Sequence, residues 1–457
     1  MSGSLALLLL GLQVLYIMIV NVAATSTNTS TLDHKLYGRS PQAPAANFKP
    51  PGNNRKMPSS PGPPMNGIDD GNGTPRNQQS KGKPVPFGFG SKVTGGGNAA
   101  PQTPKDTAEL KAWLTDKVPR VILIRRTYDF SLGAGNITAA ACRPWKACTN
   151  GLQVQTAKDF NNWCSKDQKL PSNIQVSLQA SPMDPIKVAS HKTLLGVGAA
   201  GIIKGKGLVL NRVQNVIIQN IHITWLNPQV VWGGDGISLN GATQIWIDHC
   251  SFSNIGRQMI VSGGTSQATA NTGITISNNL FMGKTKWSSR CNDRHYWTAL
   301  FSGANDQITM ARNCFDSTSG RNPKTGGSGN PKVLLHYYNN LHTNIEGETF
   351  QVGQGSNLLA EGNVFKNAKI HNNGDLKTQF GGKSFVPFRP EDSTVCSQVI
   401  GRPCVINLSL QSSKYNFALE TQALNSFKGR PEVTQSRPLP AANIQNGVPG
   451  SCGVGHV

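Results

Sequence analysis

An aspartate and an arginine are spaced so that they could act together on a charged substrate. Asp235 and Arg257 are 22 residues apart, which is about one turn of the repeat described below. On neighbouring turns, a carboxylate can orient a guanidinium through a bidentate pair. A guanidinium held in this way can stabilise negative charge that develops during a reaction. The alternative is a salt bridge between turns with a structural role only.

The sequence does not favour two other kinds of chemistry. His249 and Cys250 are adjacent in an alternating strand, so their side chains point to opposite faces and cannot form a nucleophile and base pair. Hydrolysis of a glycosidic bond requires a pair of carboxylates, and the repeat strands contain no Asp-Asp constellation.

The elements that must position Asp235 and Arg257 belong to a degenerate repeat. In each unit an alternating apolar strand meets a polar residue, then usually Asn, then another aliphatic residue or Cys. The units read VIIQNIHI, IWIDHCSF, ITISNNLF, ITMARNCF, VLLHYYNNL and LLAEGNVF. Each is too small to bury its own apolar face, so the repeat predicts stacked coils that share one core, a β-solenoid.

A recurrent polar position marks the bends of this solenoid. The anchors are Asn220, His249, Asn279, Asn313, Asn340 and Asn363. Asn tolerates the left-handed backbone conformation at a sharp bend, and stacked Asn side chains can hydrogen-bond along the solenoid. We therefore expect a structural ladder at these positions.

Composition and charge fit an extracellular β protein. The 457 residues include 49 Gly and only 15% charged residues, and the net charge is +21. Residues 1–100 carry +6 of this charge, from nine Lys/Arg and three Asp, and the rest is spread along the body. No nucleic-acid-binding motif accompanies the charge. We expect no nucleic-acid partner, and a basic surface of this kind suits an acidic polymer.

The N-terminal region predicts export. The apolar run LALLLLGLQVLYIMIV is followed by small residues near Ala23 and Ala24, so residues 1–24 are interpreted as a signal peptide, with an uncleaved membrane anchor as the alternative. Residues 25–89 are rich in Pro, Gly, Asn, Ser and Lys and predict a disordered basic linker. Residues 90–457 form the expected folded domain. Nine cysteines and glycosylation sequons also suit a secreted protein without stable membrane association. The sequons are at Asn28, Asn72, Asn136 and Asn407.

Four segments resemble the pectin lyase branch of the pectate/pectin lyase superfamily. They are SHKTLLGVGAAGIIKGKGLVL, VVWGGDGISLNGATQIWIDHCSFSNIGRQ, SRCNDRHYWTALFSGANDQITMARNCF and STSGRNPK. With the coils between them they cover roughly residues 90 to 430, in the family's order. The resemblance implies an all-β fold, a right-handed single-stranded parallel β-helix with long loops and short flanking helices. It also implies a substrate cleft along one strand face.

The resemblance implies a monomeric lyase that cuts methyl-esterified galacturonan within the chain and needs no metal or other cofactor. Cleavage removes the C5 proton of a uronate, develops negative charge at the C6 carbonyl and expels the C4 oxygen, so it requires cations near the carboxyl end. Arg257 stands where calcium-dependent relatives carry a metal-binding carboxylate, and a guanidinium can replace the charge of Ca²⁺ but cannot bind it. Asp235 is then expected to orient Arg257.

The same resemblance places Arg321, in STSGRNPK, at the family's essential arginine. That residue is proposed as the base that takes the C5 proton. Arginine is normally always protonated, so a role in charge stabilisation is the alternative. Lys324 is expected to assist at the carboxyl group. The segment 325–332 reads as an inserted loop beside the cleft, and Met259 replaces a His that the family commonly has.

Aromatic residues are expected to line the cleft, because sugar rings present apolar CH faces. The residues that match family positions are Trp145, Trp163, Trp232, Tyr296 and Trp297. Ordinary core packing is the alternative for each of them. The matching segments also imply the disulfides Cys142–Cys164, Cys148–Cys291 and Cys396–Cys404. Cys250 and Cys314 are expected to be buried free thiols, and Cys452 is left without a partner.

Two other functions remain open from the sequence. The basic charge would also suit a calcium-dependent pectate lyase. A non-catalytic β-helix that binds cell-wall polysaccharide is the second alternative, with the basic N-terminal segment as a tether.

Overall fold

The computed structural model describes residues 84–149, 151–263, 269–327, 329–370, 380–412, 418–447 and 450–457. The expected signal peptide, the linker up to residue 83 and the sequons at Asn28 and Asn72 lie outside these ranges. Within them, every helix is too short or too polar to cross a membrane.

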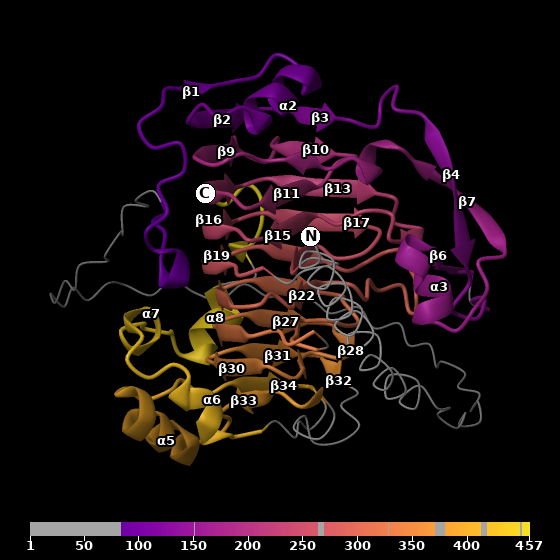
Figure 1. Ribbon diagram of the computed structural model, residues 1–457. Helices are drawn as coiled ribbons and strands as arrows, with labels where there is room; N and C mark the ends of the chain where they lie inside the picture. The colour runs from indigo at the N-terminus through magenta and orange to yellow at the C-terminus, as the bar shows by residue number, and fades with distance from the viewer. Residues whose placement is uncertain are drawn as a thin grey trace, which may run out of the picture. The chain divides into compact units, whose positions relative to one another are not determined.

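Three parallel sheets run the length of the described domain, and a typical coil contributes one strand to each of them (Figure 1). Sheet 1 has the order β29 (Gln351–Val352), β25 (Lys324–Thr325), β22 (Ala299–Phe301), β18 (Ile260–Ser262), β15 (Ile237–Asn240), β11 (Leu208–Asn211) and β8 (Ile186–Lys187). Sheet 2 has the order β1 (Pro101–Gln102), β2 (Arg120–Ile124), β9 (Lys192–Gly196), β12 (Gln214–Gln219), β16 (Thr243–Asp248), β19 (Thr272–Ser277), β23 (Asp306–Ala311), β26 (Val333–Tyr338), β30 (Ser356–Glu361) and β33 (Lys383–Phe385). Sheet 3 has the order β3 (Thr127–Asp129), β10 (Ile202–Lys204), β13 (His222–Leu226), β17 (Ser251–Ile255), β20 (Leu280–Met282), β24 (Cys314–Asp316), β27 (Leu341–Thr343), β31 (Val364–Lys366) and β34 (Leu408–Leu410).

The coil explains this order. The chain passes from β15 in sheet 1 to β16 in sheet 2 and β17 in sheet 3, then returns to sheet 1 at β18. The expected right-handed parallel β-helix is therefore confirmed. Loops that lead from sheet 3 back to sheet 1 vary most in length, since β20 and β22 are separated by residues 283–298 whereas β17 and β18 are separated by residues 256–259.

Smaller elements surround the coils. The small strands are β4 (Asn136–Cys142), β5 (Gln153–Val154), β6 (Thr156–Lys158), β7 (Ile174–Gln179), β14 (Val230–Val231), β21 (Trp287–Ser288), β28 (Glu346–Gly347) and β32 (Lys369–Ile370). The helices are η2 (Gly88–Gly90), α2 (Thr107–Thr115), η3 (Phe160–Asn162), α3 (Trp163–Lys166), η4 (Ser181–Met183), α5 (Pro390–Ile400), α6 (Thr421–Asn425), α7 (Pro431–Thr434) and α8 (Ala441–Gly447). In Figure 1, β13 and β17 point toward the side of the β-helix on which β4, β6 and α3 lie.

Like residues stack along the interior because the strands pair in register. In sheet 3, Phe252 pairs with Phe281, which pairs with Phe315. The rings of Phe281 and Phe315 are 4.6 Å apart and nearly parallel. His342 continues this stack at 4.7 Å from Phe315, and Phe365 follows it at 4.9 Å. The alternating apolar strands of the sequence therefore become continuous columns that bury the core of every coil.

A ladder of asparagines joins sheets 2 and 3. The Oδ1 of Asn313 accepts from the backbone N–H of Asn279 at 3.0 Å and from its Nδ2 at 2.9 Å. Asn340 and Asn363 repeat this pattern one coil at a time. The ladder also includes Asn407, whose Oδ1 accepts from Asn363. Because the Asn407 amide is buried and donates to two carbonyl groups, this sequon is not available for a glycan.

The ladder prediction was wrong at its first two positions. Asp248 pairs with Gln219 and with Ser277, so His249 aligns with Asn220 and Asn278 rather than with Asn279. Asn220 and His249 have φ of 58° and 49°, which places them in the left-handed bend one residue before the ladder. The spacing in sequence identified the bend but not which of two adjacent residues stacks.

The folded domain begins before residue 90. The backbone N–H of Phe89 donates to Thr309 Oγ1 at 3.1 Å, and that of Gly90 donates to Thr275 Oγ1 at 2.9 Å. Phe89 is 8% exposed. The predicted linker of residues 25–89 therefore extended too far, because its last residues already lie against the outer face of sheet 2.

Four disulfides are present among the described residues. Three are the bonds that the resemblance implies, Cys142–Cys164, Cys148–Cys291 and Cys396–Cys404. The fourth joins Cys314 to Cys452, which corrects the expectation of a free thiol and an unpaired cysteine. This bond holds the C-terminal segment against sheet 3, where both residues share an apolar cluster with Ile444. Cys250 is a buried free thiol, as expected.

Candidate functional site

The predicted catalytic residues lie where loops from sheet 3 enter sheet 1. Asp235 precedes β15, Arg257 precedes β18 and Arg321 precedes β25. The backbone N–H of Arg257 donates to Gly234 O, and that of Ala299 donates to Arg321 O. These bonds place Asp235 and Arg257 on neighbouring coils, and the coil of β22 lies between Arg257 and Arg321. The structure therefore brings Asp235, Arg257 and Arg321 to the same end of sheet 1.

Arg257 is a buried cation held on two sides. Its guanidinium carbon lies 3.9 Å from the centre of the Trp232 ring, and its Nε lies 3.2 Å from Asp235 Oδ1. The residue is 7% exposed. Burial lowers the pKa of Arg257, while the charge of Asp235 opposes this effect and the charge of Arg321 adds to it. Arg321 is therefore close enough for the two positive charges to interact.

The expected bidentate pair between Asp235 and Arg257 is not formed. The single contact at 3.2 Å lacks hydrogen-bond geometry, and Arg257 Nε has no hydrogen-bond partner. Asp235 Oδ1 instead accepts from the backbone N–H of Gln258 at 2.8 Å. The carboxylate therefore fixes the backbone beside Arg257 and balances its charge, while the Trp232 ring determines the plane of the guanidinium.

Arg321 lies against two aromatic rings. Its guanidinium carbon is 4.6 Å from the centre of the Trp297 ring and 6.0 Å from that of Tyr296. Arg321 has a φ of 51°, a left-handed conformation that is uncommon for arginine. The side chain is half-buried, and its Nε lacks a hydrogen-bond partner among the described residues. Both arginines thus have an aromatic ring packed against the guanidinium and an Nε donor without a hydrogen-bond partner among the described residues.

All five predicted aromatic residues belong to one cluster. Trp145, Trp163 and Trp232 are half-buried, whereas Tyr296 and Trp297 are each 7% exposed. The cluster also contains the disulfide Cys142–Cys164, which joins β4 to α3. Tyr296 and Trp297 therefore form a buried wall behind Arg321, and the other three offer more surface to a ligand.

Lys324 is half-buried at the start of β25 and pairs with Leu300 and Gln351 through the backbone. The segment that follows it leads from β25 to β26 in sheet 2. It therefore leaves the end of sheet 1 opposite Arg321, and its expected place beside the cleft stays a prediction. Met259 is fully buried in the main core, so the residue at this position points inward rather than toward a substrate.

Two residues that sequence reasoning did not single out hold this site in place. His295 Nε2 lies 2.8 Å from Arg257 O and 3.0 Å from Trp297 O. Burial lowers the pKa of His295 to about 4, so the ring is neutral at neutral pH and one N–H can serve both carbonyl groups. His295 directly precedes Tyr296 and Trp297, which match family positions, and this place in the sequence could have identified it as a residue of the site.

Glu348 is the second such residue. Its carboxylate accepts from Tyr296 Oη at 3.1 Å and from Arg290 at 3.2 Å, and its carbonyl accepts from Asn322 Nδ2 at 3.0 Å. Glu348 therefore supports the wall behind Arg321 and the residue that follows it. Its surroundings in sequence, EGETF, carry no signal of this role.

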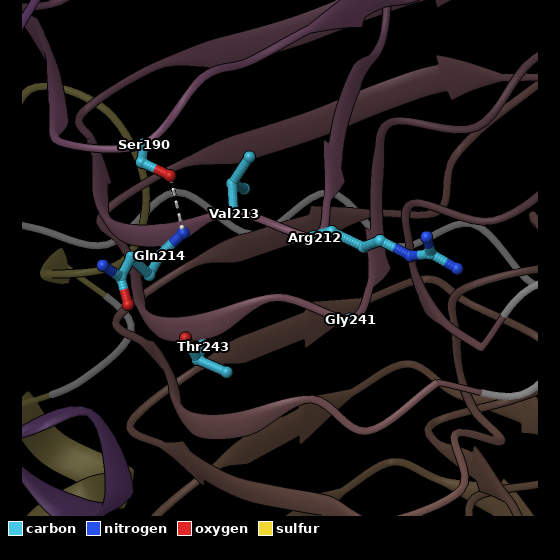
Figure 2. A pocket seen from close by; sticks show the side chains of 6 residues that line it. All are labelled: Ser190, Arg212, Val213, Gln214, Gly241 and Thr243. Atoms are coloured by element: carbon cyan, nitrogen blue, oxygen red, sulfur yellow. Dashed lines mark hydrogen bonds between the residues drawn. The ribbon is translucent and has the colours of Figure 1, made fainter. Parts of the chain in front are cut away.

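Among the described residues, no group of three or more His, Cys, Asp and Glu side chains could hold a metal ion. A pocket of about 300 Å³ is lined by residues of the turns between sheets 1 and 2. Figure 2 shows Ser190 Oγ accepting from the backbone N–H of Gln214, while the Arg212 side chain points away from both. None of the predicted site residues lines this pocket.

Comparison with known proteins agrees with the fold and with the matched segments. Residues 172–428 match the family model described as pectate lyase. The chain is 44% identical over 326 residues to a probable pectin lyase F of Aspergillus flavus, covering 71% of this chain and 72% of the relative. It is 39% identical over 369 residues to a probable pectin lyase A of Aspergillus clavatus, covering 80% and 93%.

Among solved structures, a pectate lyase from Bacillus sp. N165 in complex with trigalacturonate is similar, with a TM-score of 0.52 and 17% identity, over 81% of this chain and 99% of the other. A pectate lyase from Paenibacillus sp. 0602 has a TM-score of 0.50 and 15% identity, over 82% and 96%. At this level of identity the likeness supports the β-helix fold alone.

Proposed function

Because the chain belongs to the pectate lyase family, and is thus a polysaccharide lyase, we propose that it is a secreted, monomeric pectin lyase. Its substrate is methyl-esterified (1→4)-α-D-galacturonan, which it cleaves by β-elimination within the chain. Relatives at 39% and 44% identity are named probable pectin lyases, which supports this substrate.

One observation carries the proposal, the buried Arg257 held between Trp232 and Asp235 close to Arg321. Elimination transfers the C5 proton to a base, breaks the C4–O bond and forms a C4–C5 double bond, while negative charge gathers transiently on the C6 carbonyl oxygen. The departing C4 oxygen takes up a proton and leaves as a hydroxyl group. A methyl ester is neutral, so this charge can be met by two guanidinium groups. Arg257 and Arg321 supply them, and the half-buried indoles provide apolar faces for the sugar rings.

The first test separates this proposal from a calcium-dependent pectate lyase. Unsaturated product is followed by absorbance, with highly methylated pectin in excess EDTA and with polygalacturonate plus Ca²⁺. We expect full activity on methylated pectin in EDTA and little on polygalacturonate. Loss of activity in EDTA would overturn the proposal.

The second test concerns Arg321. Arg321→Lys keeps a positive charge but loses the planar guanidinium that rests on Trp297. We expect kcat to fall by about a hundredfold or more, as when a group that acts in the transition state is removed. Arg402→Lys, a distant arginine that bonds Glu361, is the matched control and should retain kcat. Full activity of Arg321→Lys would contradict the catalytic role of Arg321, whereas a wild type without lyase activity would favour a non-catalytic polysaccharide-binding protein.

A further inference from the structure

Trp225 occupies a backbone position that most other coils give to small or polar residues. The strands of sheet 3 end in a column of left-handed residues, aligned by their register. The column contains Gly205, Trp225, Asn254, Ser317, Asn344, Asn367 and Gln411, all with positive φ. Phe130 and Gly283 share the register but are not in the left-handed conformation. Gly and Asn adopt this conformation readily, whereas a bulky side chain does so at a cost in free energy. Trp225, with a φ of 59°, is the one aromatic residue in this column.

Core packing does not account for Trp225. The side chain is 42% exposed, while its neighbours Thr224 and Leu226 are buried. An exposed tryptophan in a strained backbone position gains little from burial and loses free energy locally. Such strain persists at sites where it serves a function, which directs attention to what the ring contacts.

The ring of Trp225 meets a second tryptophan at a right angle. Trp287 lies in the long loop between β20 and β22, and the two ring centres are 6.2 Å apart at 81°. Trp287 is held in place, because its Nε1 donates to Gln153 Oε1 at 2.8 Å and its backbone pairs with β5. The exposed Lys286 places its Nζ 4.6 Å from the Trp287 ring centre. The result is a rigid apolar corner with one cation beside it.

This corner adjoins the candidate site through shared segments. Trp225 lies near the end of β13, which leads into the loop that carries Trp232 and Asp235, and Trp287 lies in the same loop as Trp297. Gln155, two residues after the Gln153 that holds Trp287, accepts from Trp297 Nε1 at 3.1 Å. The corner is therefore built on the same loops as the site, but its rings are not part of the aromatic cluster behind the arginines.

We propose that Trp225, Trp287 and Lys286 form an accessory binding site for a galacturonan chain, outside the site of cleavage. The apolar CH face of a pyranose ring suits an exposed indole, and the Lys286 ammonium suits a free uronate carboxylate along a partly esterified chain. The inference rests on the proposed function. The accessory site would bind polymeric substrate in addition to the cleavage site. Its residues should therefore affect the binding of long chains but not the elimination step.

The test uses Trp225→Asn, which removes the ring and installs the residue type found at Asn254 in the next coil. We expect its thermal stability to match or exceed that of the wild type, so the variant separates binding from folding. KM for polymeric methylated pectin should rise about two- to tenfold, while kcat stays constant and kinetics on methylated trigalacturonate do not change. Trp287→Ala should act in the same direction. Leu132→Ala, which removes a side chain that is 78% exposed elsewhere, is the matched control and should leave KM unchanged.

Retention of each variant in native gels containing partly methylated pectin measures binding independently of catalysis. We expect Trp225→Asn to migrate faster than the wild type in the pectin gel and equally fast without pectin. Equal retention and equal KM in an active enzyme would overturn the accessory site while leaving the lyase function intact. Dissociation of a wild-type dimer by Trp225→Asn, seen by sedimentation, would assign the corner to a second copy of the chain and also overturn the proposal.

Discussion

His295 and Glu348 show how the site is held without taking part in the proposed chemistry. The imidazole bonds the carbonyl groups of Arg257 and Trp297, and the Glu348 carboxylate bonds Tyr296. Both act on the backbone or the wall behind the arginines. They are positioning residues, and the guanidinium groups they place are the ones that would meet the substrate.

At the residue scale, Asp235→Asn tests how the charge of Arg257 is balanced. The amide oxygen can still accept from Gln258, but the opposite charge beside Arg257 is lost. Removal of one member of a buried ion pair leaves the other charge uncompensated, so we expect kcat/KM on methylated pectin to fall roughly ten- to a hundredfold. Asp184→Asn, which removes an exposed carboxylate paired with Lys111 and Lys206 away from the site, is the control. Unchanged kcat/KM for Asp235→Asn would mean that Asp235 has no part in holding Arg257.

At the element scale, the asparagine ladder and the stacked interior side chains hold the coils together. Each coil contributes the same few positions, and each position bonds or packs against the coils on either side. A defect in one coil is therefore felt mainly by its two neighbours.

Asn313→Ala tests the ladder. Asn313 Oδ1 accepts two bonds from Asn279, and Asn313 Nδ2 donates to Ile276 O and to Asn340. Its removal leaves buried groups without partners, which costs about 1–3 kcal/mol for each group. We expect urea unfolding to show a loss of several kcal/mol. Asn240→Ala removes an exposed bond to Asn211 and a part-buried bond from Thr269 Oγ1, and should cost about 1–2 kcal/mol, less than Asn313→Ala. Similar losses for both variants would contradict a special role for the ladder.

His342→Phe tests the pH dependence of the interior stack. Burial lowers the pKa of His342 to about 3, from 6.5. Because the folded state resists protonation of this ring, its contribution to stability is complete above about pH 6.5 and is lost as pH falls toward about 3. The loss at pH 4.5 is about 3 kcal/mol. A phenylalanine fits between Phe315 and Phe365 and does not titrate.

We therefore expect the free energy of unfolding, measured with urea at several pH values, to fall less steeply below pH 6.5 in His342→Phe than in the wild type. The variant also loses the contact of His342 Nε2 with Tyr337 Oη, which lowers its stability by a similar amount at every pH. Parallel curves for the two proteins would contradict the prediction.

At the scale of the whole molecule, Cys314–Cys452 ties the end of the chain to sheet 3. The two cysteines are separated by 138 residues, and removal of a native disulfide costs about 2–5 kcal/mol. We expect the double variant Cys314→Ser, Cys452→Ser to unfold at lower urea concentration, with kcat unchanged at 25 °C because the bond is not part of the aromatic cluster at the site. Cys250→Ala, which removes the buried free thiol, is the control. Equal stability of wild type and double variant would indicate that the bond does not form in solution.

The repeat of apolar strands and bend residues was sufficient to predict the β-helix. Local alternation dictates which side chains face inward, and a unit too short to bury itself must stack. Asn279, Asn313, Asn340 and Asn363 could be found from spacing because the repeat is written along the chain. The positions of Asp235, Arg257 and Arg321 at one end of sheet 1 also follow from strand order once the coils are in register.

Other features depend on contacts between distant segments and could not be predicted from spacing. Register decided that Cys250, rather than His249, aligns with Asn279 in the ladder, and spacing could not decide this because two adjacent residues at a bend have similar sequence preferences. The bond of Cys314 to Cys452 depends on where the C-terminal segment returns. Trp232, rather than a second contact from Asp235, orients Arg257 because the planar ring packs on the guanidinium. Sequence periodicity determined the coil, and only tertiary structure decided which side chains of different loops meet, because those distances are determined by packing rather than by separation along the chain.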